Sequence, residues 1–150
     1  MNRSEMFMNS FLSHRNVTTK LVKKIEEEHY RYKPTESSMS AQTLVLHMMT
    51  TFYHFSAAAA GVSPVDPYAD EEKVDLVKLT KAYTEETTKL IQSMSDEDFN
   101  KEVDLTKIIG IKLPAAQVLQ MALEHEIHHK GNLFVYVREM GHTDLPLYVG

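Results

Sequence analysis

The stretch HEIHHKG, residues 125–131, places three histidines within five positions. His125 and His129 are four residues apart, so on a helix their side chains lie about 40° apart around the axis and one turn apart along it. Two imidazoles in this arrangement can bind one metal ion, as in zinc-binding HxxxH helices. Histidine pairs at this spacing also occur as solvated or core residues, so the spacing alone leaves both interpretations open.

A third histidine, His47, favours the metal interpretation. It is expected in the middle of a helix over residues 41–60, on the apolar side and one turn before Thr51. A buried imidazole needs a polar partner, which for a lone residue is usually a neighbouring hydroxyl or carbonyl group. Because His125 and His129 are also expected to face inward, one divalent cation could satisfy all three rings. We therefore predict a metal site made of His47, His125 and His129.

Glu126 is expected inside the apolar arc of the last helix, where a carboxylate is unusual. One interpretation is an ion pair between two helices. The other is functional: an acceptor that orients a ligand imidazole, or a proton acceptor beside a metal-bound water. Glu126 is therefore the candidate catalytic residue.

The remaining histidines near this region have weaker patterns. His54 follows His47 by about two helical turns, near 10 Å, so it can line the same cavity without binding the same ion. His14 is expected to be a core or cavity-lining residue, and His128 is expected at the boundary or surface of its helix.

Hydrophobic periodicity indicates four helices that would position these residues. The predicted helices cover residues 3–29, 41–60, 71–94 and 114–141. Ser40 and Asp70 are predicted N-caps, and Pro114 suits a first helical turn. The connector 95–113 contains VDLTKIIGIKL, which is rich in β-branched residues and could form a short strand or hairpin.

Four such helices predict an all-α four-helix bundle in a single domain covering residues 1–150. The loop 61–70 is long enough to cross between the second and third helices.

The composition narrows the possible functions. The chain has 150 residues, a net charge of −5 and 43% hydrophobic residues, which argues for a soluble globular domain and against a general nucleic-acid binder. It contains no cysteine, so neither a disulfide nor a protein thiolate ligand is possible. Neither a signal peptide nor an apolar segment long enough to span a bilayer is recognised, so we expect a cytoplasmic protein that does not associate with membranes.

The sequence resembles the DinB family over essentially its whole length. The resemblance rests on the histidine in QTLVLHMMTTFYHF, on LEHEIHHKGNLFVYVREMG and on the tail GHTDLPLY. It implies a bundle with an up-down-down-up path, a divalent metal held by residues matching His47, His125 and His129, and a homodimer. Relatives with known chemistry are transferases and isomerases that use low-molecular-weight thiols such as bacillithiol or mycothiol.

Two positions depart from the family pattern. Many relatives carry a tryptophan after the helix-two histidine, where this chain has Phe52, Tyr53 and Phe55. Many begin the last helix with Ser or Thr, where this chain has Leu113 and Pro114. The first difference would change the wall of the pocket and therefore bears on the substrate.

These observations lead to one functional hypothesis and two alternatives. Three neutral imidazoles leave a tetrahedral cation with an open position, at which a thiol or water would be activated. The hypothesis is thiol transfer to a small electrophilic substrate at a zinc or nickel ion. The alternatives are a metal-dependent hydrolase and a metal-binding or ligand-binding bundle without catalysis.

Overall fold

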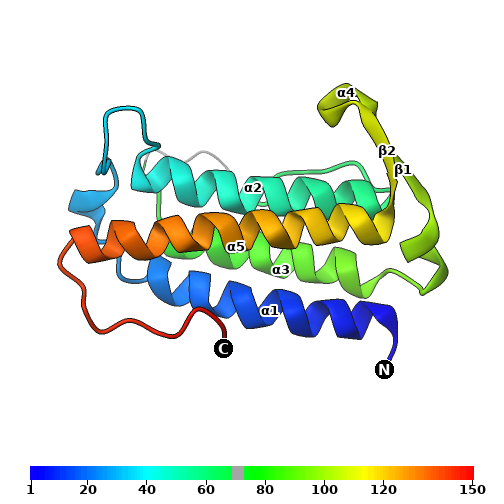
Figure 1. Ribbon diagram of the computed structural model, residues 1–150, viewed down its shortest axis with the longest axis horizontal. Coiled ribbons are helices and arrows are strands. Elements are labelled where there is room, and N and C mark those ends of the chain that lie inside the picture. The colour runs from blue at the N-terminus through cyan, green and yellow to red at the C-terminus, as the bar shows by residue number, and fades with distance from the viewer. Residues whose placement is uncertain (69–72) are drawn as a thin grey trace.

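The computed structural model describes residues 1–68 and 73–150. Its four long helices lie side by side: α1 (Arg3–Val22), α2 (Ala41–Ala60), α3 (Leu76–Gln92) and α5 (Ala115–Glu139) (Figure 1). Each packs against two others, α1 and α2 both lying between α3 and α5. Among the described residues, no helix combines the length and apolarity needed to cross a membrane.

Two apolar clusters fill the interior, one toward each end of the helices. The first contains Leu21, Met48 and Leu133, and the second contains Phe11 and Leu119. Polar side chains that are fully or almost fully buried lie among them, namely those of Arg15, Thr18, Glu126 and Lys130. The core is therefore apolar at both ends and carries charge in its middle.

The prediction for α2 is confirmed at both ends. The Ser40 hydroxyl accepts a hydrogen bond from the backbone N–H of Thr43 at 3.2 Å and caps the N-terminus. Gly61 ends the helix with φ of 71°, a left-handed conformation that glycine adopts without steric cost. His47 consequently lies near the middle of a regular helix.

The first predicted helix is too long. α1 ends at Val22, and the next backbone N–H groups form tighter i→i+3 bonds, Lys24 to Leu21 and Ile25 to Val22. A short 3₁₀-helix, η1 (Glu27–His29), follows. This turn keeps the Ile25 side chain in the core. The contacts that favour the turn come from other parts of the chain, so the hydrophobic periodicity of the first helix does not reveal it.

The third helix begins later than predicted. α3 starts at Leu76, and Asp75 caps it by accepting hydrogen bonds from the backbone N–H groups of Val77 and Lys78. The cap predicted at Asp70 lies outside the described residues. An aspartate five residues later supplies the same chemistry at the observed helix start.

The predicted hairpin in the connector is confirmed. After a 3₁₀-helix, η2 (Glu97–Asn100), β1 (Glu102–Leu105) pairs antiparallel with β2 (Ile111–Pro114), with Val103 opposite Leu113. The connection is the four-residue helix α4 (Thr106–Ile109) and Gly110. The hairpin projects from one end of the helices, where α5 begins (Figure 1).

Candidate metal centre

The structure brings the three predicted histidines together. His47 projects from α2, and His125 and His129 project from successive turns of α5, which packs on α2. One ring nitrogen from each residue lies within 4.8 Å of the others, and Nε2 of His47 is 3.0 Å from Nε2 of His125. The three rings meet edge to face, with centroid separations of 4.4, 4.7 and 4.9 Å.

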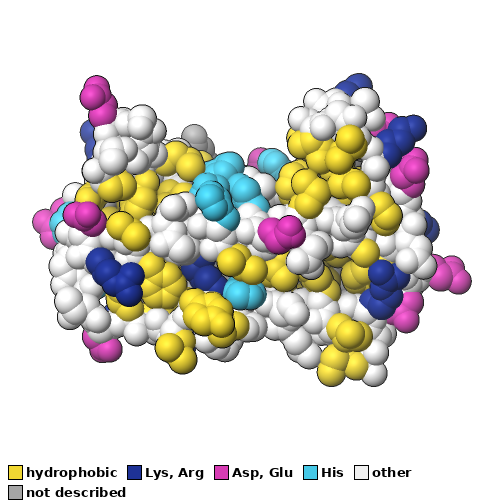
Figure 2. All heavy atoms as spheres, in the orientation of Figure 1, with side chains coloured by type: hydrophobic (Ala, Val, Ile, Leu, Met, Phe, Trp, Pro, Cys, Tyr) yellow, Lys and Arg dark blue, Asp and Glu magenta, His cyan; other side chains and the backbone are white. Residues whose placement is uncertain are grey.

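The centre is accessible from one side of the molecule. In Figure 2 a cluster of histidine side chains occupies a hollow near the middle of the face, between the raised hairpin and the raised loop before α2. His47 and His125 are half-buried, so part of each ring is covered by protein and part faces the hollow. A small molecule could therefore approach the three rings directly.

Hydrogen bonds on the far side of two rings determine which nitrogen faces inward. Oδ1 of Asn132 lies 3.2 Å from Nδ1 of His129, and Oγ1 of Thr51 lies 3.5 Å from Nδ1 of His47. When Nδ1–H donates to Asn132, the lone pair of His129 is left on Nε2, the nitrogen available to an ion.

The surroundings of His125 and His129 favour the neutral form of these two rings. Burial, together with the neighbouring imidazoles of His129 and His47, lowers the pKa of His125 to about 4. Burial also lowers the pKa of His129, against an opposing effect of its bond to Asn132. Metal binding requires neutral imidazole, so these rings do not need to lose a proton near neutral pH.

The donor set fits a divalent cation. Nitrogens bound tetrahedrally to zinc at the usual bond lengths lie roughly 3.4 Å from one another. The 3.0 Å separation between His47 and His125 requires only a small outward movement to reach that value. Three imidazole nitrogens would leave a tetrahedral ion with one position for an exogenous ligand such as a thiol or water.

Glu126 faces the interior of the bundle and forms an ion pair. Its Oε1 and Oε2 each lie 2.9 Å from a guanidinium nitrogen of Arg15, and Thr18 donates a hydrogen bond to Oε2 at 2.7 Å. Arg15 also donates to Oγ1 of Thr84 at 3.0 Å. Of the two interpretations given above for Glu126, this geometry supports the pair between helices.

The electrostatics agree with a permanent carboxylate. Burial alone would raise the pKa of Glu126, but the charge and hydrogen bonds of Arg15 and the hydrogen bond from Thr18 hold that pKa below its ordinary value. Among the described residues, no hydrogen bond joins Glu126 to His47, His125 or His129.

The other histidines lie outside this cluster. His54 is half-exposed, with Nε2 2.9 Å from Oδ1 of Asp66. Nδ1 of His14 lies 2.6 Å from Nζ of Lys130, which also donates to the carbonyl oxygen of Tyr148. His128 is exposed, as predicted, although its ring lies 4.7 Å from that of His129.

Arg15 and Lys130 are both buried, and neither was predicted from the sequence as a residue of this region. A signal for Arg15 was present, because it follows Phe11 by four residues and precedes Thr18 by three, and so shares their helix face. Lys130 likewise follows Glu126 by four. Each cation lies on an inward face where an apolar residue would be expected.

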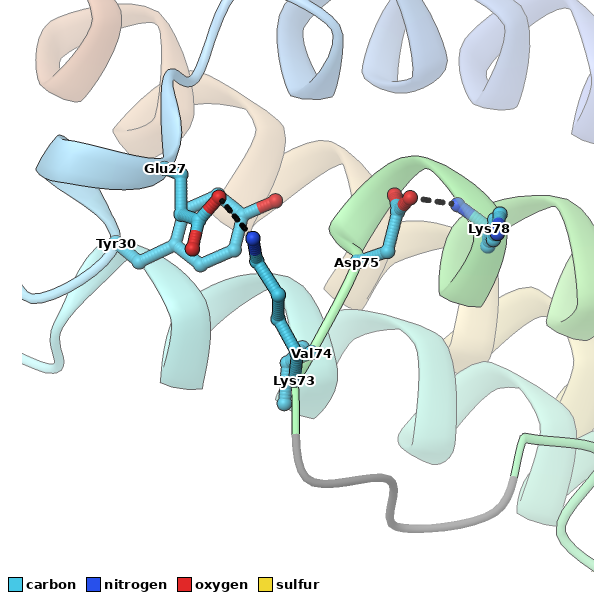
Figure 3. A pocket seen from close by; sticks show the side chains of 6 residues that line it. All are labelled: Glu27, Tyr30, Lys73, Val74, Asp75 and Lys78. Carbon is cyan, nitrogen blue, oxygen red and sulfur yellow. Dashed lines mark hydrogen bonds and ion pairs between the residues drawn. The ribbon is translucent and has the colours of Figure 1, made fainter.

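A separate hollow lies where η1 meets the start of α3 (Figure 3). It measures about 420 Å³ and is lined by Glu27, Tyr30, Lys73, Val74, Asp75 and Lys78. Nζ of Lys73 lies 3.3 Å from Glu27, and Asp75 accepts a hydrogen bond from the backbone of Lys78 at 3.1 Å. Lys73 and Glu27 pair with each other and Asp75 caps α3, so the histidine cluster is the better candidate for a functional site.

Comparison with known proteins agrees with this architecture. The family model described as "DinB family" matches residues 1–150. The uncharacterized protein YjoA of Bacillus subtilis is 49% identical over 150 residues, which cover 99% of this chain and 97% of YjoA.

Two solved structures are similar in fold. A crystal structure of the DinB-like YjoA from Bacillus subtilis matches with a TM-score of 0.86 and 48% identity, covering 96% of this chain and 98% of that one. A DinB-like protein from Bacillus cereus matches with a TM-score of 0.77 at 18% identity, covering 95% of each chain. The full-length match of the family model and the identity to YjoA show that this chain belongs to the DinB family.

Proposed function

We propose that this protein binds a divalent metal ion through His47, His125 and His129 and uses it to transfer a low-molecular-weight thiol to a small electrophile. The observation that carries the proposal is the convergence of three imidazoles from two helices on one accessible point, two of them with a lowered pKa. A bound divalent cation would hold a thiol as its reactive thiolate. Because the chain has no cysteine, the sulfur must come from a substrate.

Residues of the protein orient the rings of this centre. Asn132 lies 3.2 Å from Nδ1 of His129 and Thr51 lies 3.5 Å from Nδ1 of His47, and the packing of α2 on α5 brings the rings together. Zinc and nickel both suit imidazole ligands. Metal-dependent hydrolysis is less well supported, because its candidate proton acceptor, Glu126, already has Arg15 and Thr18 as partners.

The family resemblance also suggests the chain path and the assembly. We infer an up-down-down-up four-helix bundle in a single domain, since α1 packs on α3 and α5 rather than mainly on α2. We also infer a homodimer. The exposed side chains of Ile108 and Ile111 on the hairpin offer apolar surface for such contacts.

A thiol-transfer assay tests the function. Zinc-loaded or nickel-loaded protein should accelerate the reaction of bacillithiol, glutathione or cysteine with 1-chloro-2,4-dinitrobenzene, in which sulfur bonds to the aryl carbon and chloride leaves. The product is followed by its absorbance, and His47→Ala protein treated with the same metal serves as the control. If neither metal-loaded form exceeds the control with any of the thiols, the transferase proposal is wrong; hydrolysis of activated esters without thiol would point to the hydrolase.

Asn132 should tune the strength of metal binding. Removing the acceptor of a ligand histidine usually weakens metal affinity about 10-fold to 100-fold, and we expect a loss in that range for Asn132→Ala. Asn132 is exposed, so the substitution should leave the fold intact. Competition with a chromogenic chelator measures the affinity, and Asn132→Asp, which keeps the acceptor, should retain most of it. Equal affinities of Asn132→Ala and the unaltered protein would contradict the assigned role.

A further inference from the structure

A pocket adjoins the histidine cluster on the side of the loop that precedes α2. Its volume is about 340 Å³, at the lower end of the range for small-molecule sites. His129 forms part of its wall, so a molecule in the pocket would lie beside the centre. The other lining residues are Pro34, Ser37, Ser38, Met39, Leu44, Asn132, Val135 and Tyr136.

The pocket is uncharged. Among the described residues, no Asp, Glu, Lys or Arg lines it, although charged residues make up 25% of the chain. An ionised group placed there would lose hydration without gaining a partner of opposite charge, which is unfavourable. A neutral group would avoid that cost.

The polar groups of the pocket are few, and several already have partners. The Tyr136 hydroxyl donates to the carbonyl oxygen of Met39 at 2.7 Å, and Ser38 Oγ lies 2.5 Å from Thr35 Oγ1. Asn132 directs Oδ1 at His129, which leaves its amide N–H groups as donors. Leu44 and Val135 supply apolar surface.

We propose that this pocket binds the uncharged, mainly apolar part of the electrophilic substrate, through its apolar wall and a hydrogen bond from the Asn132 amide to a carbonyl-type oxygen. The inference rests on the proposed function, because it assigns the second substrate of the same centre. The electrophile lies against His129 and Asn132, while the thiol occupies the open position at the histidines. Carboxylate-bearing and ammonium-bearing electrophiles are poor ligands of this pocket.

Benzamide and benzoate form a matched pair of probes, alike in size and shape and different in charge. Each is titrated into zinc-loaded ¹⁵N-labelled protein, and binding is followed by amide chemical shifts. We expect benzamide to bind in the range of about 10 mM or tighter and to shift the resonances of Asn132 and Val135. Benzoate should bind these residues at least about tenfold more weakly.

Val135→Lys introduces a positive charge at the pocket wall. Val135 is 49% exposed, so a longer polar side chain is compatible with folding there. The variant should gain affinity for benzoate about tenfold, whereas Val135→Leu, the uncharged control, should keep the original preference. Benzoate could also bind through its carboxylate to the zinc ion itself. Repeating the titrations in His47→Ala, which is expected to lose the metal, removes that mode of binding and leaves only binding to the pocket.

The possible outcomes separate this inference from the proposed function. If benzoate equals benzamide at Asn132 and Val135 in the His47→Ala background, or if neither probe shifts these residues, the pocket assignment is wrong even when thiol transfer is observed. If the pocket discriminates as expected but no thiol is consumed, its preference for uncharged ligands holds, whereas the transferase proposal and the role of the ligand as an electrophile fail.

Discussion

Replacing His47 with alanine is expected to remove tight metal binding while leaving the helices intact. The remaining ligands, His125 and His129, both lie on α5, so the ion would lose its link to α2. Removing a residue that only hydrogen-bonds to a metal-binding histidine already weakens metal affinity about 10-fold to 100-fold. Removing one of the metal-binding histidines should therefore weaken it more than about 100-fold. Elemental analysis after dialysis with zinc or nickel should give one ion per chain for the unaltered protein and almost none for the variant.

His128→Ala is the matched control for this experiment. His128 is exposed and lies next to His129 in the sequence, yet it is outside the converging group. It should therefore retain the metal, and circular dichroism should show unchanged helix content for both variants. Equal metal content in His47→Ala and His128→Ala would show that the convergence of the three rings is not the binding site.

Replacing Arg15 with methionine is expected to destabilise the protein strongly. Arg15 and Glu126 are completely buried, and the substitution leaves the carboxylate without its cation. Breaking a buried pair in this way typically costs about 3–5 kcal/mol in the free energy of unfolding. Among the described residues, Glu126 would keep the hydrogen bond from Thr18 and the more distant positive charge of Lys130. Urea denaturation followed by circular dichroism measures the change.

The double variant Arg15→Met with Glu126→Leu tests the cause of that loss. Removing both charges removes the uncompensated carboxylate, so much of the stability should return. Lys89→Met is a surface control, because the pair between Lys89 and Glu86 is exposed to solvent and its loss should change the free energy of unfolding little. A double variant as unstable as Arg15→Met would mean that lost packing, rather than the stranded charge, is responsible.

The histidine centre could be predicted from the sequence because each of its residues lies on the apolar face of a regular helix. A spacing of four fixed the relative position of His125 and His129, and the clear boundaries of α2 fixed the orientation of His47. The pairing of α2 with α5 does not follow from periodicity, since an apolar stripe does not identify its partner. The DinB resemblance supplied that information.

Other features depended on contacts between distant parts of the chain. The early end of α1 reflects a turn that keeps Ile25 in the core. Arg15 and Glu126 are 111 residues apart and lie on different helices. The hydrophobic pattern of either helix alone therefore could not reveal that they pair. The pocket beside His129 is formed partly by the irregular segment 34–39, whose conformation has no periodic signal.

Neighbouring residues of α5 lie in different environments. His125 and His129 converge with His47 at the candidate metal centre, while Glu126 and Lys130 are buried inside the protein. Turning this helix about its own axis by one residue, about 100°, would expose the carboxylate and carry an imidazole inside. The buried ion pair between Arg15 and Glu126 thus restrains the rotation of α5 about its own axis, and with it the direction in which His125 and His129 point. A substitution at Arg15 could therefore disturb chemistry on the opposite side of the helix without touching any atom there.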